Sequence, residues 1–423
     1  MSCTNIFSIL DLDFYAYSLQ LYDSFPALTN REDAEFVLKN CLDKDDLMVF
    51  FKEVIGNAGI YAQVSTWIHR RKMLLPAFGP KVLKGFVDIQ SIQGQMLVEQ
   101  LSHDDRVGTG PFSVWPYISA YTLSSVSETA LGVKLDAQRN PNIPFLKAVA
   151  DVLSFMTRRL VEMWLWPEFI YKFNSSDATI LYLNLISSFK TSTGQDSENK
   201  SFLDHLLILS ADGNRLNNME LREEILVMLL AGTDSSAVAI GYTLMLLAKY
   251  PQVQEKLYAE LISVFGDEDR KLKEYDLKQL DYLNKVVKES LRLFTPVPVV
   301  ARKTGTEEMK LPSGTILPPG TGCVLSLWGI NRDPKYWGAD ADCFNPERFC
   351  DDDLVNLATF SLGPRNCIGY QYALQSVKIA VSSIVRHYKV VGEVESSPVP
   401  RIDSVFSIMM RAKDDFKISL EKR

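Results

Sequence analysis

Residues 360–369, FSLGPRNCIG, decide what fold this chain can adopt. The stretch holds one cysteine, Cys367, between Gly363 and Gly369, with Arg365 two residues upstream and Phe360 at its start. Glycines let the backbone turn tightly and approach a flat cofactor closely. Backbone N–H groups directed at the sulfur favour the thiolate, which is the form that binds a metal. The pattern therefore favours a metal-ligating loop over the alternative, a buried structural cysteine in a glycine-rich turn.

Composition argues against several other functions. The chain has 423 residues, of which 47% are hydrophobic and 23% are charged, as in a globular protein with a large core. Its net charge of −7 gives no electrostatic support for nucleic-acid binding. The six cysteines form no CxxC pair, which argues against a disulfide framework. The four histidines form no HExxH pattern, so a zinc hydrolase has little support.

The longest helix is predicted for residues 217–250. Asn217 and Glu220 have the spacing of a capping pair, and Pro251 ends the segment. About 33 residues at ~1.5 Å each would cross a whole domain. The central part is apolar apart from Asp234, so a transmembrane helix is an alternative. Because an unpaired charge at mid-bilayer is costly, the pattern favours a helix in a soluble core.

Small and polar residues interrupt the middle of this helix. Residues 231–236 read AGTDSS. A glycine inside a helix lowers its stability by about 1 kcal/mol relative to alanine. Gly232 therefore indicates that another group approaches the helix closely at this point. Asp234 and Ser235 place an acid beside an alcohol, which supplies a proton route and a hydrogen-bonding hydroxyl.

Two further patterns carry charges at helical spacing. Trp67 and Arg71 lie four residues apart on one helix face, where both can donate to a carboxylate. Glu289 and Arg292 form an ExxR pair, and Arg348 follows within PERF. Taken singly, these patterns have ordinary alternatives: an amphipathic helix with its Trp in the core, and a weak surface ion pair.

Five motifs in this order resemble the cytochrome P450 family: WxxxR, AGxDS, ExxR, PERF and FxxGxRxCxG. Residues 129–138, TALGVKLDAQ, resemble the insect microsomal branch that groups with fatty-acid hydroxylases. The resemblance implies a mainly α fold with small β-sheets, in which haem lies between a long central helix and the cysteine-ligand loop. It also implies a single domain over residues 1–423, without the N-terminal membrane anchor that such proteins usually carry.

The resemblance assigns a role to each motif. Cys367 would ligate the haem iron, and Asp234 and Ser235 would manage proton delivery. The haem propionates would be held by Trp67, Arg71, Arg302 and Arg365. The remaining cofactor contacts would come from Phe360, Gly363, Gly369 and Ala231. The neighbouring basic residues His69, Arg70 and Lys72 would lie on the surface where an electron donor docks.

Three positions depart from the family pattern. Ser235 stands where threonine is usual, which keeps the hydroxyl but loses the methyl group that restricts its rotamer. Ala231 stands where related fatty-acid hydroxylases often carry a glutamate that esterifies the haem. Asn331 replaces histidine in an HRDP-like motif, so we expect a contact to be lost there.

The activity implied is a monooxygenase that inserts one oxygen atom from O2 into a lipophilic small molecule, such as a fatty acid, hormone, odorant or xenobiotic. The sequence has no GxGxxG after a strand, so electrons must come from a partner. That partner would be NADPH–cytochrome P450 reductase, with cytochrome b5 as a second candidate donor. A monomer at the cytosolic face of the endoplasmic reticulum membrane is expected. Substrate contacts are expected in residues 50–62, 112–124, 156–173 and 404–407.

Two other functions remain open. A haem-thiolate isomerase or dehydratase would rearrange peroxides without a reductase, but such enzymes tend to lose the acid–alcohol pair that this chain keeps. A non-catalytic haem-binding or ligand-binding protein is favoured by the departures at Ser235 and Asn331.

Overall fold

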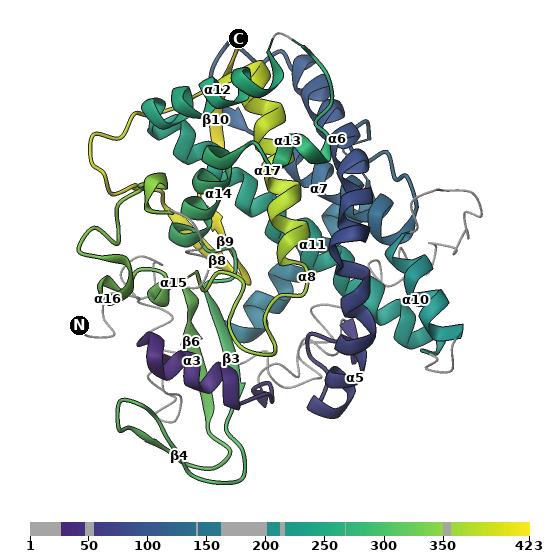
Figure 1. Cartoon of the computed structure of the whole chain (residues 1–423), viewed down its shortest axis with the longest axis vertical. Helices are drawn as coiled ribbons and strands as arrows, with labels where there is room; N and C mark the ends of the chain where they lie inside the picture. The colour runs from purple at the N-terminus through teal and green to yellow at the C-terminus, as the bar shows by residue number, and fades with distance from the viewer. Residues whose placement is uncertain are drawn as a thin grey trace.

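The computed structural model describes residues 27–46, 55–140, 143–161, 201–211, 216–266, 268–349 and 357–423. In this part of the chain, helices dominate and the strands are short, so the mainly α fold class is confirmed (Figure 1). The α-helices are α3 (Arg31–Asn40), α5 (Val64–Leu74), α6 (Pro80–Ser102), α7 (Trp115–Leu131), α8 (Pro144–Val161), α10 (Phe202–Ala211), α11 (Asn218–Lys249), α12 (Pro251–Phe265), α13 (Glu274–Leu277), α14 (Asp281–Leu293), α15 (Leu327–Ile330), α16 (Pro334–Trp337) and α17 (Tyr370–His387).

Among the described residues, four small sheets accompany these helices. The first has the strand order β1 (Ala27–Leu28), β6 (Gly322–Ser326) and β3 (Val299–Lys303), with β1 parallel and β3 antiparallel to β6. In the second, β10 (Lys417–Lys422) lies between β2 (Phe112–Ser113) and β7 (Tyr388–Val391). Two hairpins complete the set: β4 (Met309–Lys310) with β5 (Ile316–Leu317), and β8 (Ser404–Ser407) with β9 (Met409–Ala412).

The predicted long helix is α11, and both of its ends lie where the sequence places them. The Asn217 side chain accepts hydrogen bonds from the backbone N–H groups of Met219 and Glu220, and the Glu220 carboxylate accepts one from the Asn217 N–H. This capping box satisfies N–H groups that a helix end leaves unpaired. Pro251 begins the next helix, α12, because proline cannot continue a helix but suits its first turn.

Helix α11 passes through the core of the protein. Among the described helices it is the one long and apolar enough to cross a membrane, yet 78% of its apolar stretch is buried inside the protein. It contacts α7, α14 and α17, and α17 runs down the middle of Figure 1 beside α6. A helix buried all round is apolar all round, so burial accounts for its hydropathy.

Two glycines on α11 allow neighbouring elements to approach closely. A Cβ at Gly232 would lie 3.0 Å from Val126 Cγ2 on α7. A Cβ at Gly241 would lie only 2.5 Å from the ring of Phe416, just before β10. The close approach that the sequence indicates at Gly232 is therefore that of helix α7.

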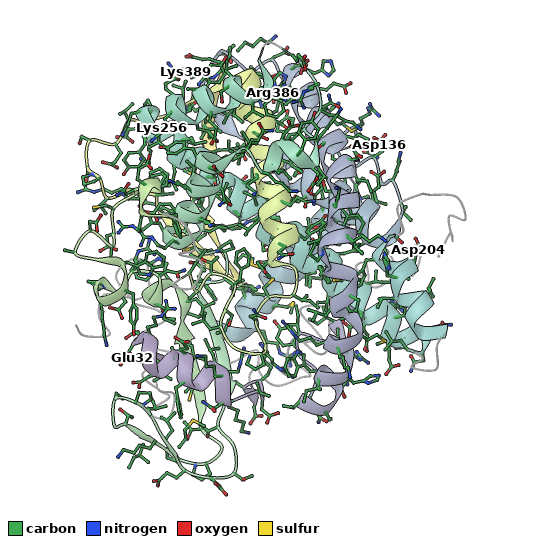
Figure 2. The ribbon with its side chains drawn as sticks, in the orientation of Figure 1. Glu32, Asp136, Asp204, Lys256, Arg386 and Lys389 are labelled. Atoms are coloured by element: carbon green, nitrogen blue, oxygen red, sulfur yellow. The ribbon has the colours of Figure 1, made fainter. Side chains whose placement is uncertain are left out.

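Charged side chains occupy two different environments. Glu32 on α3, Lys256 on α12 and Lys389 on β7 are exposed at the outside of the molecule (Figure 2). Glu289 and Arg292 on α14, by contrast, are fully buried. Buried charges are tolerated only when they are paired and hydrogen-bonded. Glu289 and Arg292 therefore mark a network of paired charges inside the protein.

Candidate active site

The cysteine loop is a compact turn that ends at the start of α17. The Cys367 N–H donates to the Phe360 carbonyl at 2.8 Å, and the Asn366 N–H donates to the Gly363 carbonyl at 3.2 Å. Gly363 has a φ of +73°, and a Cβ there would lie 2.4 Å from the Leu38 carbonyl oxygen on α3. Only glycine fits these two requirements together.

The Cys367 side chain is accessible to solvent, but many protein atoms surround it. These surroundings raise the pKa of its thiol, whereas the Gly369 N–H and the Arg71 charge act to lower that pKa. Burial therefore opposes ionisation of the thiol. A metal cation would compensate the cost of ionising it, which is the usual way in which metal binding displaces the thiol proton.

Trp67 and Arg71 on α5 lie against this loop. The Arg71 guanidinium donates to both the carbonyl oxygen and the side-chain oxygen of Asn366, at 2.7 and 2.5 Å. The Arg365 guanidinium lies 4.6 Å from the centre of the Trp67 ring. The structure therefore brings together three of the predicted propionate-binding residues from positions some 300 residues apart in the chain.

Arg302 on β3 and Arg365 form a buried cationic pair. Burial lowers the pKa of each guanidinium to about 10. The charge of Arg365 lowers the pKa of Arg302 further. For Arg365, the charge of Asp43 partly opposes the decrease in pKa and that of Arg71 adds to it. Arg302 Nε and both Nε and Nη1 of Arg365 lack a hydrogen-bond partner in the described part of the chain. Buried cations of this kind require anionic partners. The two carboxylates of a haem would meet this requirement, so the donor set fits the cofactor.

Lys44, which sequence reasoning missed, belongs to the same cationic group. Burial, followed by the charges of Arg302 and Arg365, holds its pKa well below the ordinary value. Its ammonium nitrogen lies 5.9 Å from the centre of the Tyr61 ring. Residues 42–46 read LDKDD, which resembles an exposed polar turn, and no local signal distinguishes this lysine from a surface one.

The ExxR and PERF motifs form one network of charged side chains, rather than the weak surface ion pair that was the alternative. Arg292 donates to the Glu289 carboxylate through Nε at 2.7 Å and Nη2 at 2.9 Å. Arg348 reaches the same carboxylate through Nε at 3.5 Å. Arg292 also donates to the carbonyl oxygens of Asn331 at 2.8 Å and Cys343 at 3.1 Å. The three charges therefore tie α14 to the PERF motif and to the segment that precedes it.

The acid–alcohol pair lies in the middle of α11. Burial raises the pKa of Asp234, and the charge of Arg411 on β9 partly opposes this increase. Arg411 lies 3.7 Å above the centre of the Trp115 ring. The Ser235 hydroxyl donates to the Ala231 carbonyl at 2.6 Å, within its own helix. Sequence reasoning did not find Arg411, because its proximity to Asp234 arises from tertiary packing.

A small apolar cavity of about 60 Å³ lies beside Ala231. The residues that line it are Ile55, Ile60, Tyr61, Met156, Val227, Leu230, Ala231, Ile408 and Met409. Two of the predicted substrate segments, 50–62 and 156–173, contribute lining residues, although residues 50–54 and 162–173 lie outside the described part of the chain. No residue of the predicted segment 404–407 lines the cavity; Ile408 and Met409, which directly follow it, do. No residue of the fourth segment, 112–124, lines this cavity, because α7 packs against α11 instead.

The expected basic patch on α5 needs a correction. His69 and Lys72 are exposed, but Arg70 is buried. The Arg70 guanidinium donates to Glu224 at 2.9 Å and to Glu220 at 3.0 Å, both on α11. The helix turns by about 100° per residue, so Arg70 points inward while its neighbours point outward.

Comparison with known proteins agrees with this geometry. The cytochrome P450 family model matches residues 26–418, so the chain belongs to the cytochrome P450 family. The protein is therefore a haem-thiolate monooxygenase, an oxidoreductase with haem iron as its cofactor.

Individual members of the family from insects and mammals are similar to this chain over most of its length. Cytochrome P450 4d2 of Drosophila melanogaster is 31% identical, over 93% of this chain and 84% of that protein. Cytochrome P450 4V2 of Homo sapiens is 33% identical, over 86% of this chain and 74% of that protein. Cytochrome P450 4c3 of Drosophila melanogaster is 30% identical, over 84% and 72%. The chain is thus similar to cytochrome P450 4 proteins of both insects and mammals.

Proposed function

We propose that this protein, as a single domain, inserts one oxygen atom of O2 into a lipophilic small molecule, with Cys367 as the ligand of the haem iron. The substrate gains one oxygen atom, the second leaves as water, and NADPH and a proton supply the two electrons and the protons. Thiolate-ligated haem, when bound, supplies the oxygen-activating chemistry. The loop that presents Cys367 between Phe360 and Gly369 is the observation that carries this proposal.

The chain's own contribution begins with holding the cofactor. Trp67, Arg71, Arg302 and Arg365 bind the propionates, with Lys44 as a further cation. The support is that Nε of Arg302 and both Nε and Nη1 of Arg365, on two buried guanidinium groups, have no hydrogen-bond partner among the described residues. Gly363 and Gly369 keep the backbone close to the cofactor, and Phe360 covers the loop on the side facing α17, where its ring lies 6.0 Å from that of Tyr370.

Asp234 and Ser235 move the protons. A buried carboxyl with a raised pKa holds its proton closer to neutral pH than an exposed one, which suits a group that must accept and release protons. Rotation of the Ser235 hydroxyl away from the Ala231 carbonyl would make it available to a bound substrate or water. Serine rotates more freely than threonine, so this site tolerates more than one hydroxyl position.

The substrate is lipophilic because the cavity beside Ala231 is lined almost entirely by aliphatic side chains. Such a lining offers burial of apolar surface and few hydrogen bonds, so it selects by shape and hydrophobicity. Fatty acids, hormones, odorants and xenobiotics share these properties.

The electron donor is NADPH–cytochrome P450 reductase, with cytochrome b5 as a second donor, at the cytosolic face of the endoplasmic reticulum membrane. His69 and Lys72 on the exposed side of α5 suit an acidic partner near the cysteine loop. We propose that the enzyme acts as a monomer.

One experiment separates this function from its alternatives. Purified protein with added reductase should consume NADPH and form an oxygenated product, and the reduced carbon-monoxide complex should show the long-wavelength Soret band of thiolate-ligated haem. Turnover of hydroperoxides without reductase would instead support an isomerase or dehydratase. Ligand binding with neither activity would support a non-catalytic binding protein. Cys367→Ala should lose both the Soret band and the turnover.

A further inference from the structure

Asn331, which departs from the family's usual histidine, is fully buried directly after α15. Its side-chain Nδ2 donates to the hydroxyls of Thr295 and Thr359, each at 2.9 Å. Its side-chain oxygen accepts the Ala358 N–H at 2.8 Å. The contact loss that the sequence suggests at this position is not what the structure shows, because the amide uses both of its donor hydrogens and its acceptor oxygen.

The partners of Asn331 join the charged network to the cysteine loop. Thr295 follows α14, and the Asn331 carbonyl accepts a hydrogen bond from Arg292 at 2.8 Å. Thr359 directly precedes Phe360, whose carbonyl accepts the Cys367 N–H at 2.8 Å. A continuous path of hydrogen bonds and backbone therefore runs from the ExxR network through Asn331 to the cysteine.

The chemistry of the two threonines explains why an amide is suited to this position. Both the Thr295 and Thr359 hydroxyls donate to the Leu291 carbonyl, at 3.0 and 2.8 Å. Their hydrogens are committed, so each can only accept from Asn331. The Ala358 N–H can only donate. The site thus requires two donors and one acceptor from a single short side chain, which asparagine supplies and aspartate does not.

We propose that Asn331 is a positioning residue that holds the entry of the cysteine loop against α14 and so fixes Cys367 for ligation. The proposal rests on the assignment of Cys367 as the haem ligand. It assigns Asn331 no contact with substrate or cofactor. Its effect passes through Ala358 and Thr359 to Phe360.

The test compares Asn331→Ala and the nearly isosteric Asn331→Asp with a matched control, Gln254→Ala. Gln254 is also a buried amide, which donates to the carbonyls of Leu247 and Val390 and accepts from the Val390 N–H and, at 3.4 Å, from Arg423. It joins α12 to β7 and has no bond to the cysteine loop. Removing either amide should lower the urea midpoint by a similar amount, because each leaves comparable buried groups unpaired.

The Soret band of the reduced carbon-monoxide complex separates positioning from general stability. In both Asn331 variants, a several-fold larger fraction of the haem than in the wild type should be in the short-wavelength form, which has lost its thiolate ligand. Gln254→Ala should keep the wild-type spectrum. Equal spectra for all three variants would overturn the proposal.

Hydrogen exchange provides a second readout that does not need bound haem. The Cys367 amide should exchange about tenfold faster in the Asn331 variants than in Gln254→Ala, because its bond to Phe360 opens more often. Unchanged exchange at this amide would equally overturn the proposal. Cys367→Ala tests the ligand assignment separately: if it keeps the thiolate band, that assignment fails, while the exchange rate still reports on Asn331.

Discussion

Replacing Gly363 with alanine tests the most constrained position of the cysteine loop. The residue has a φ of +73°, and an added Cβ would lie 2.4 Å from the Leu38 carbonyl oxygen and 2.8 Å from its carbon. Both contacts are with the backbone of α3, so no flexible side chain can move aside. The substitution must therefore strain the loop, displace it from α3, or both.

The expected cost follows from these two effects. An alanine in the left-handed region costs about 1–2 kcal/mol relative to glycine. Forcing extra atoms into a packed contact costs a further ~1–3 kcal/mol. The total of roughly 2–5 kcal/mol is a large part of the 5–15 kcal/mol by which proteins are typically stable. Because the displaced segment carries Cys367, haem occupancy should decrease together with stability.

Gly314 provides a matched control. Its φ is +90°, but an added Cβ would meet no atom within 4 Å. Gly314→Ala should therefore show only the conformational cost of about 1–2 kcal/mol. Urea unfolding and the ratio of Soret to protein absorbance measure both quantities. If Gly363→Ala and Gly314→Ala have the same unfolding midpoint and the same haem content, the steric argument for the loop is wrong.

Three further predictions concern single side chains. Glu289→Gln should destabilise the protein by about 3–5 kcal/mol in urea unfolding, since it leaves the buried Arg292 without its counter-charge; wild-type stability would show that the network is dispensable. Asp234→Asn should gain stability relative to the wild type as the pH rises above 3.8, the ordinary pKa of aspartate. Burial raises the pKa of Asp234 in the folded state, so above that pH the wild type loses stability because folding must either bury a charge or bind a proton. A constant difference in unfolding free energy between pH 4 and 8 would contradict this. Haem should be extracted completely by acidified organic solvent, because Ala231 carries no carboxylate to form an ester; pigment that remains with the protein would exclude this reading.

Features set by short-range chemistry could be predicted from the sequence. The ends of α11 depend on Asn217, Glu220 and Pro251, which lie within a few residues of the helix ends they define. The cysteine loop depends on glycines at fixed spacing around Cys367. The Glu289–Arg292 pair lies at i,i+3 on one helix face. In each case the interacting groups are neighbours in the chain, so a sequence pattern can report them.

Features that depend on distant segments could not be predicted in this way. Lys44 and Arg411 look like surface residues until folding places one beside Arg302 and the other near Asp234. Arg70 reads as part of a basic surface, but α5 turns it toward the carboxylates of Glu220 and Glu224.

The family, the ligand loop and the long central helix can be recognised from the amino-acid order alone, because each follows from residue spacing within short stretches. The folded arrangement was needed to show which charges are buried, which partners they meet, and that Asn331 links the charged network to the loop of Cys367. The physical reason is that burial and pairing depend on which elements pack together. That packing joins residues tens to hundreds of positions apart, where no local pattern records it.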